Sequence, residues 1–110
     1  MKTETYADTL RISDLHDLDE DRAADLVHAI RLALPAGIRA IEFDLSQVRS
    51  IDSDSVGMLA AVHDEVSRPG SVFTWRVLNP APTVRQFLEL VRLHRLFEIT
   101  PPRSAEWATS

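Results

Sequence analysis

The sequence contains no cysteine and only three glycines, and these two shortages exclude several kinds of chemistry. Without thiols the protein has no disulfide framework, no thiolate nucleophile and no cysteine-ligated metal, which fits a reducing compartment. The glycines Gly37, Gly57 and Gly70 are isolated, so no glycine-rich loop is present to hold the phosphates of a nucleotide. Chemistry in this chain therefore depends on oxygen or imidazole groups, and we expect no cofactor.

Long apolar runs are also absent, and positive charge is scarce. No segment approaches the roughly 20 apolar residues that span a bilayer, and the start at Lys2-Thr3-Glu4 lacks the pattern of a signal peptide. The net charge is −5, and the acidic excess lies in residues 1–52. A protein that binds nucleic acid needs the opposite balance. We therefore expect a cytoplasmic protein with no nucleic-acid partner and no membrane insertion.

The length and composition predict one globular domain. The chain has 110 residues, of which 45% are hydrophobic and 26% charged, close to the average for soluble globular proteins. Residues 1–100 carry the periodic apolar patterns, whereas residues 101–110 are a proline-containing C-terminal tail. We expect Trp75 to lie in the core and Trp107 in the tail.

Helical and extended apolar patterns alternate along the domain. Apolar residues recur at three- and four-residue steps in residues 22–34 and 53–66 and again after Pro82, which predicts three helices. A short further helix is expected around Leu96 and Phe97. Alternating or β-branched residues predict strands at residues 2–6, 10–12, 39–45 and 71–78. This order predicts an α/β fold in which a mixed β-sheet of about four strands is packed against helices.

The residue types used for metal binding and covalent hydrolysis are not arranged for those functions. The histidines His16, His28, His63 and His94 fall on different predicted elements and lack the paired spacing of a metal site. Acidic residues from Asp14 to Asp25 are explained by the negative charge that a helix N-terminus favours. No serine lies in a G-x-S-x-G elbow. We expect no metal site, no catalytic residue and no enzymatic activity.

The most informative segment is Ser50-Ile51-Asp52-Ser53-Asp54-Ser55-Val56-Gly57, between a predicted strand and a predicted helix. Asp and Ser are preferred N-cap residues, so local helix chemistry alone would place them here. An exposed hydroxyl at a helix N-terminus can also accept a phosphoryl group, which adds a charge of about −1.5 to −2. Ser53 and Ser55 are the two candidate phosphoacceptors.

Several short motifs in this chain resemble the STAS domain family of anti-sigma factor antagonist type. Residues 43–53, FDLSQVRSIDS, resemble the family pattern L-D-L-S-x-V-x-x-I-D-S-S-G-L-G. Residues 78–84, LNPAPTV, resemble the family's V-N-P-S-P-x-V entry to a helix, and residues 87–99 resemble its closing segment. Asp17-Leu18-Asp19 is similar to the family's Glu-Leu-Asp. The resemblance spans about residues 9–100, with the motifs in the family's order and spacing.

The resemblance implies a protein switch. In the antagonist branch, the serine after the loop aspartate is phosphorylated by a histidine-kinase-like serine kinase that is also the anti-sigma factor. The unphosphorylated antagonist sequesters this kinase and frees a sigma factor, and a serine phosphatase restores that form. By resemblance, Ser53 is the phosphoacceptor with Ser55 as runner-up, and Asp52, Asp54, Gly57 and Asp19 line the partner-binding neighbourhood.

Departures from the family pattern keep other functions open. Asp54 and Ser55 stand where the family has Ser and Gly, and His16 replaces a glycine. At roughly 6 Å, Asp54 would oppose a phosphoserine by about 0.7 to 3 kcal/mol. The first alternative is a non-switching scaffold or accessory subunit of a stress-signalling assembly or of a lipid/ABC transporter, whose partner is a STAS scaffold protein or the transporter ATPase. A nucleotide- or ligand-binding module is a third, less favoured alternative.

Overall fold

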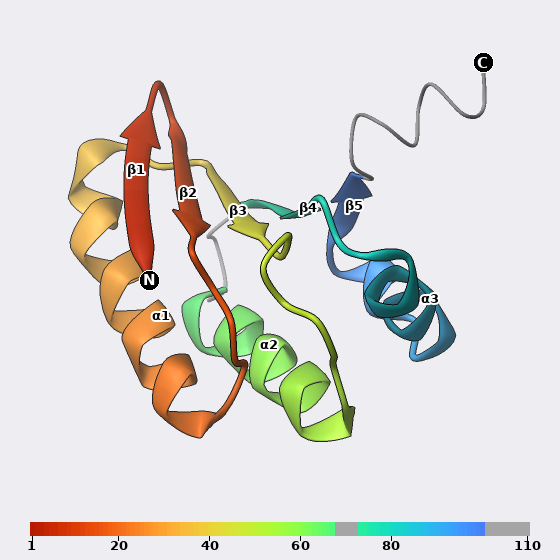
Figure 1. Ribbon diagram of the computed structural model, residues 1–110. Coiled ribbons are helices and arrows are strands. Elements are labelled where there is room, and N and C mark those ends of the chain that lie inside the picture. Colours follow the sequence, from red (N-terminus) through yellow and green to blue (C-terminus); the bar gives the residue numbers. More distant parts are fainter. Residues whose placement is uncertain (68–72, 101–110) are drawn as a thin grey trace, which may run out of the picture.

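A β-hairpin opens the chain, and helices and strands then alternate in the computed structural model, which describes residues 1–67 and 73–100 (Figure 1). The strands are β1 (Lys2–Tyr6), β2 (Thr9–Ser13), β3 (Ala40–Asp44), β4 (Thr74–Leu78) and β5 (Glu98–Thr100). The helices are α1 (Glu20–Ala33), α2 (Ser53–Val66) and α3 (Pro82–Leu90), with short 3₁₀ turns at η1 (Leu34–Ala36) and η2 (Leu93–Arg95). None of the helices in the described ranges is long and apolar enough to cross a membrane.

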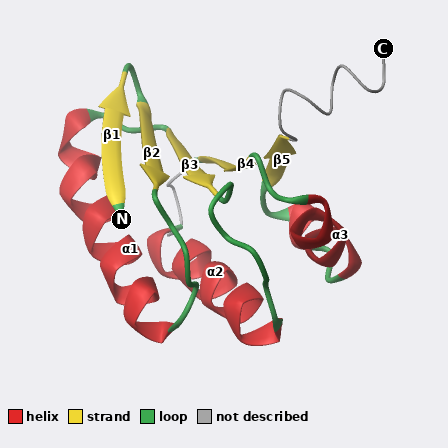
Figure 2. Cartoon of the chain, viewed as in Figure 1, coloured by secondary structure: helices red, strands yellow, loops and turns green. Residues whose placement is uncertain are grey.

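The strands form one sheet in the order β1-β2-β3-β4-β5. β1 pairs antiparallel with β2, and the other neighbours are parallel. Each parallel connection moves one strand further in the same direction, so right-handed crossovers place α1, α2 and α3 on the same face (Figure 2). The core lies between this face and the helices. Its sheet side chains, which alternate along the strands, are Leu10, Ile12, Ile41, Phe43, Trp75 and Val77.

The expected mixed sheet with packed helices is confirmed, with one more strand than expected. The chain turns helically at η2 and then extends into β5, which pairs with β4 through Val77 and Ile99. The short helix expected around Leu96 and Phe97 is therefore replaced by a 3₁₀ turn and a strand. The three residues of β5 are too few for an alternating apolar and polar pattern to be recognised in the sequence. Residues 68–72, including the start of the strand expected at 71–78, and the tail with Trp107 lie outside the described residues.

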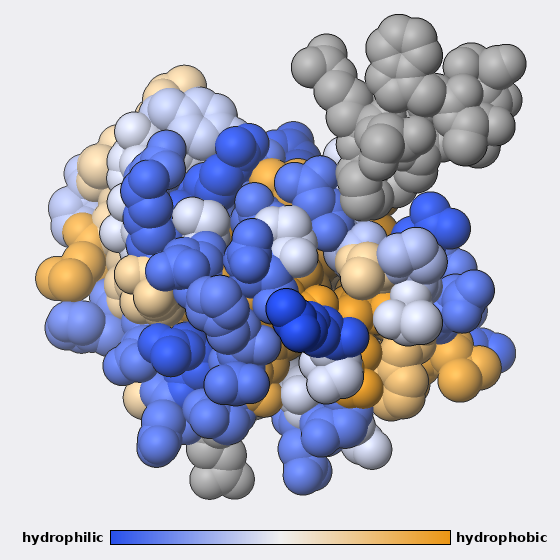
Figure 3. Space-filling view, viewed as in Figure 1, coloured by the Kyte–Doolittle hydropathy of each residue, from blue (hydrophilic) through white to orange (hydrophobic). Residues whose placement is uncertain are grey.

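The sheet face opposite the helices carries alternating charges. The register aligns one residue from each strand across this face: Glu4, Arg11, Glu42, Arg76 and Glu98. Arg11 Nε donates to Glu42 Oε1 at 3.1 Å, and Arg76 Nη1 donates to Glu42 Oε2 at 3.2 Å. We call these five residues the charge ladder. Figure 3 shows hydrophilic side chains gathered over β1 and β2, so this face is suited to water without a second layer of helices.

Glu42 lies at the centre of the ladder, with its side chain only 8% exposed. Besides the two arginines, the Tyr6 hydroxyl donates to its Oε1. Burial raises the pKa of Glu42, but the hydrogen bonds from Tyr6 and Arg11 and the charge of Arg11 outweigh burial and lower it below its usual value. Ionised Glu42 therefore joins three neighbouring strands.

We expect Glu42→Gln to lower the free energy of unfolding at pH 7 by about 1–3 kcal/mol, because glutamine has no negative charge and only one acceptor oxygen for the two arginines. A folded-state pKa below the unfolded value of 4.5 stabilises the protein above that pH. This contribution is lost as the pH falls through the folded pKa. Urea unfolding at pH 7 and below pH 4.5 should show the difference between variant and wild type shrinking on acidification.

Glu98→Gln is the matched control, because Glu98 ends the same ladder with its side chain 68% exposed. It should change the free energy of unfolding by less than about 0.5 kcal/mol. Equal losses in the two variants would contradict a central role for Glu42.

The chain leaves α3 through a residue that is unusual at its position. Arg92 has a φ of 62°, in the left-handed region that normally favours glycine after a helix. Its amide donates to the carbonyl of Glu89 at 3.0 Å, which ends the helix. An arginine in this conformation is strained relative to glycine by roughly 1 kcal/mol.

Arg92→Gly is accordingly expected to raise the free energy of unfolding by about 1 kcal/mol, because glycine adopts this conformation without strain. Thermal unfolding followed by circular dichroism should show a higher midpoint. Arg95→Gly is the control, since Arg95 lies in the η2 turn and is not at positive φ. A lower midpoint for Arg92→Gly would show that the arginine side chain stabilises the fold by more than its backbone strain costs.

Candidate functional site

The informative segment of the sequence lies at the carboxyl edge of the parallel strands. The loops after β2 and β3 both leave the sheet at this edge and end in an aspartate that caps the following helix. Asp19 is the N-cap of α1, and Asp52 is the N-cap of α2. The two helices consequently begin at the same end of the molecule (Figure 1).

The β3–α2 loop is held in place by its own apolar residues. Leu45 and Val48 are buried, and the Leu45 amide donates to the carbonyl of Leu78 at 3.0 Å. The Val48 amide in turn donates to the Leu45 carbonyl at 3.0 Å. These contacts fix the loop to the end of β4 and set where α2 begins.

Asp52 organises the first turn of α2. Its Oδ1 accepts hydrogen bonds from the backbone amide and the hydroxyl of Ser55, both at 2.9 Å. The bond from the Ser55 amide, followed by that from the Ser55 hydroxyl, holds the pKa of Asp52 below its usual range. The Ser55 hydroxyl is therefore engaged in the cap of α2, and only 7% of the residue's surface is exposed.

Ser53 differs sharply from Ser55 in accessibility. It is the first residue of α2 and is exposed, as are its neighbours Asp52 and Asp54. Gly57, one turn along the helix, is also exposed, and a Cβ added there would meet nothing within 4 Å. The structure thus brings the predicted site residues Asp52, Ser53, Asp54 and Gly57 to one surface, with Asp19 across from them at the start of α1, whereas Ser55 lies buried beneath it.

A groove of about 640 Å³ lies between these two helix starts. Small and apolar side chains line it together with carboxylates: Leu18, Asp19, Ala23, Asp52, Ser53, Asp54, Gly57, Met58 and Ala61. We call it the Ser53 groove. Its base is apolar, because Leu18 and Met58 are buried, whereas its rim carries the exposed carboxylates of Asp19, Asp52 and Asp54. Such a surface suits an apolar side chain flanked by positive charge.

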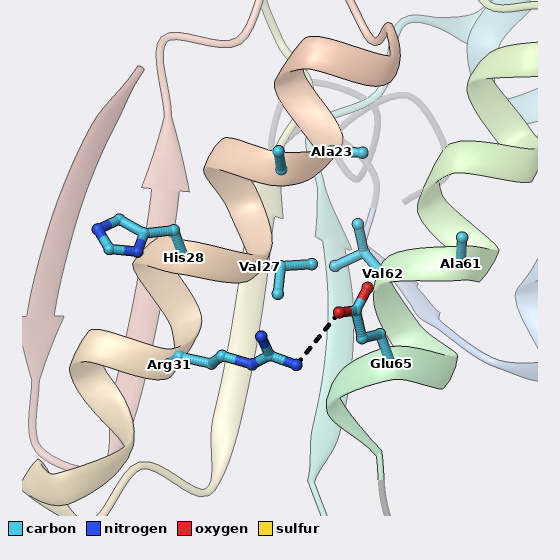
Figure 4. A pocket seen from close by; sticks show the side chains of 8 residues that line it. Ala23, Val27, His28, Arg31, Ala61, Val62 and Glu65 are labelled. Carbon is cyan, nitrogen blue, oxygen red and sulfur yellow. Dashed lines mark hydrogen bonds and ion pairs between the residues drawn. The ribbon is translucent and has the colours of Figure 1, made fainter.

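A second hollow of about 400 Å³ continues along the two helices and shares Ala23 and Ala61 with the Ser53 groove. In Figure 4, Val27 of α1 and Val62 of α2 line it and point toward each other, whereas the His28 ring points away from α2. Arg31 reaches across to Glu65, with 3.2 Å between Arg31 Nη2 and Glu65 Oε1. Sequence reasoning missed this inter-helix pair, because the two residues lie 34 positions apart and only the fold brings them together.

Within residues 1–67 and 73–100, no group of three histidine, aspartate or glutamate side chains is placed to hold a metal ion. His16 pairs with Asp14, His28 lines the inter-helix hollow, and His63 stacks on Trp75 with ring centres 4.9 Å apart. These three histidines therefore occupy separate environments. The acidic residues near the helix starts include both N-caps, as helix chemistry requires.

Asp52→Ala is expected to lower the free energy of unfolding by clearly more than Asp54→Ala does, because the first turn of α2 loses its cap and the buried Ser55 hydroxyl loses its acceptor. Asp52→Asn keeps a capping oxygen and should lose less. Urea unfolding at neutral pH measures both. Asp54→Ala is the matched control, and a loss there as large as in Asp52→Ala would contradict the role assigned to the cap.

Comparison with solved structures shows the same fold in bacterial proteins. A Thermotoga maritima protein superposes with a TM-score of 0.72 and 23% identity, covering 98% of this chain and 92% of that chain. An anti-sigma factor antagonist from Mycobacterium paratuberculosis gives a TM-score of 0.68 at 22% identity, covering 98% of this chain and 90% of that one. Phosphorylated SpoIIAA of Bacillus gives 0.60 at 19% identity, covering 99% and 98%.

A sequence search found no match among curated proteins. A family model described as "Mlab, STAS domain" matches residues 4–100, nearly the whole of the described structure. The match includes both capped helices, the Ser53 groove and all five strands except the first residues of β1. The chain belongs to the STAS domain family.

Proposed function

We propose that this protein is a phosphorylation-switched, non-enzymatic regulator of the anti-sigma factor antagonist type, with Ser53 as the phosphoacceptor. The unphosphorylated form binds an anti-sigma serine kinase and so frees a sigma factor. Phosphorylation of Ser53 releases the kinase, and a serine phosphatase resets the protein. The observation that carries the proposal is the contrast between Ser53, which is exposed and lines the Ser53 groove, and Ser55, which is buried.

The accessibility of the hydroxyl favours Ser53 over Ser55. A kinase has to align the acceptor hydroxyl with the γ-phosphate of ATP, which requires an exposed side chain. Ser53 meets this condition, whereas the Ser55 hydroxyl donates to Asp52 Oδ1 at 2.9 Å and is covered by its surroundings. Modifying Ser55 would break the first turn of α2, and modifying Ser53 would not.

A phosphate on Ser53 would change the docking surface more than the fold. At the first position of α2 it would lie near the backbone amides of the first turn and the positive end of the helix dipole, which tolerate negative charge. The rim of the Ser53 groove already carries Asp19, Asp52 and Asp54. The bulk of the phosphate would narrow the groove, and its charge would have to lose water when an apolar side chain enters, so both oppose docking of that side chain.

The partner chemistry follows from the lining of the Ser53 groove. An apolar base beneath three carboxylates suits a protein segment that inserts an apolar side chain beside lysine or arginine. Small residues such as Gly57 and Ala61 keep the groove open. The same acidic rim disfavours the phosphates of a nucleotide. A protein partner is therefore favoured over a small anionic ligand.

A second candidate function is a non-switching subunit that docks through the same groove, in a stress-signalling assembly or on the ATPase of a lipid/ABC transporter. One observation favours it, which is the exposed Asp54 beside Ser53. A permanent carboxylate next to the acceptor opposes phosphorylation electrostatically. In support of the switch, SpoIIAA, which has the same fold, is known in phosphorylated and unphosphorylated forms.

Incubation with ATP and the cognate serine kinase, followed by mass spectrometry, tests the switch. We expect phosphate on Ser53 in the wild type, none in Ser53→Ala, and continued modification in Ser55→Ala. Asp54→Ser should increase the rate of modification, because a like charge beside the acceptor is removed.

Binding to the same kinase supplies the control. Gly57→Leu should weaken binding by filling the Ser53 groove, while the fold is retained because a side chain at this position meets open space. Binding of the wild type to the kinase, with no phosphate appearing on Ser53 after incubation with ATP, would favour the non-switching subunit. Phosphate on Ser55 alone would contradict the assignment of Ser53.

A further inference from the structure

The end of α3 exposes an apolar surface that the proposed function does not use. Leu90, Val91 and Leu96 are 78%, 40% and 43% exposed, although large apolar side chains are usually buried. Arg92 and Arg95, between them in sequence, are also exposed. We call these five residues the α3 patch. Figure 3 shows hydrophobic side chains gathered on the side of the molecule where α3 lies.

Arg92 adds a second, independent observation to the α3 patch. It holds a left-handed conformation that glycine would adopt without strain. It makes no ion pair within residues 1–67 and 73–100, whereas Arg85 of the same segment pairs with Glu89. A strained backbone that holds an exposed cationic side chain suggests that this side chain contacts another molecule.

The Ser53 groove is complementary to the α3 patch. The groove has an apolar base and a rim of three carboxylates, whereas the patch has three apolar side chains beside two guanidinium groups. The groove lies at the starts of α1 and α2, and the patch lies beyond the end of α3, on a different part of the molecule (Figure 1). The two surfaces of one copy therefore do not meet.

We propose that the α3 patch of one copy docks into the Ser53 groove of a second copy. Leu90 and its apolar neighbours would enter the groove, and Arg92 and Arg95 would lie against the carboxylates of its rim. Because the two contacting surfaces differ, the contact is head-to-tail and leaves a free groove and a free patch at the ends. Each occupied groove is closed to any other partner, so self-association competes with partner binding.

The charges of the chain favour a second copy over a lipid surface. Binding to anionic lipids typically needs a cluster of about 4–8 basic residues, and the α3 patch offers two arginines on a chain of net charge −5. A second copy supplies both the carboxylates and the apolar groove that the patch lacks. The contact is small, so we expect weak association that depends on concentration and is reduced by salt.

Sedimentation velocity of the wild-type chain tests this proposal, without any kinase or phosphate. We expect species heavier than the monomer to increase with concentration up to roughly 1 mM, where even weak contacts are half-occupied. They should decrease when salt is raised from about 50 to 500 mM. A single monomeric species throughout would overturn the proposal.

Two variants that retain the fold separate the two surfaces. The patch variant, Leu90→Ser with Arg92→Gly, removes an apolar contact and a charge while relieving the strained backbone. The groove variant, Gly57→Leu, fills the Ser53 groove from a position where a side chain meets open space. Each variant alone should remain monomeric. In an equimolar mixture, the intact patch of the groove variant can dock into the intact groove of the patch variant. Because the other two surfaces are disabled, the mixture should give a species of twice the monomer mass and none larger.

The remaining outcomes each overturn the proposal. Association that survives in either variant alone would place the contact elsewhere. A mixture that stays monomeric would show that patch and groove do not pair. Binding of the monomeric wild type to vesicles rich in anionic lipid, lost in the patch variant, would assign the α3 patch to a membrane surface. None of these results depends on whether Ser53 is phosphorylated, so they are distinct from a failure of the proposed function.

Discussion

The bridging of three strands by ionised Glu42 is the interaction on which this architecture most depends. Right-handed crossovers that all advance in one direction leave three helices on one face of the sheet and none of them on the other. A parallel sheet usually needs both faces covered. Here Arg11 and Arg76 flank Glu42 on the uncovered face, and Arg76 also pairs with Glu98, so β2, β3, β4 and β5 each present a charged group whose partner lies on a neighbouring strand. The sheet remains compatible with water, and the helices carry the apolar core.

Because one face of the sheet is charged and the other is covered by helices, we expect partner binding on the helical side and at the carboxyl edge of the sheet. The open face has its central charges paired internally, which leaves little unbalanced charge there for a partner. At the carboxyl edge the opposite holds, because Asp19 and Asp52 cap two neighbouring helices and Asp54 adds a third carboxylate. The aspartates that cap the two helices thus also form most of the acidic rim of the Ser53 groove.

The fold and the main site residues were predictable from local patterns. Three- and four-residue apolar steps predicted α1 and α2, and the strand–loop–helix motif placed Asp52 and Ser53 at the start of α2, where the structure has them. These features are set by residues close in sequence. The family resemblance added the choice of Ser53 as the candidate acceptor.

Features that depend on tertiary pairing were not predictable. Charge alternation in the ladder requires the register of five strands, which no short segment encodes. The burial of Ser55 depends on how α2 packs, although its spacing from Asp52 is that of a capping pair. β5 was missed because three residues acquire strand geometry only by pairing with β4. The left-handed conformation after α3 was not predicted, because the residue there is Arg92 and not the glycine that usually marks it.

The anchoring of the β3–α2 loop has a consequence for how Ser53 is recognised. Buried Leu45 and Val48 attach the loop to the end of β4, and Asp52 fixes the first turn of the helix that follows. Across the groove, Asp19 belongs to a segment more than thirty residues earlier in the chain. A protein that recognises Ser53 in this setting therefore meets a conformational epitope assembled from two helices, and a linear peptide around Ser53 would not reproduce it.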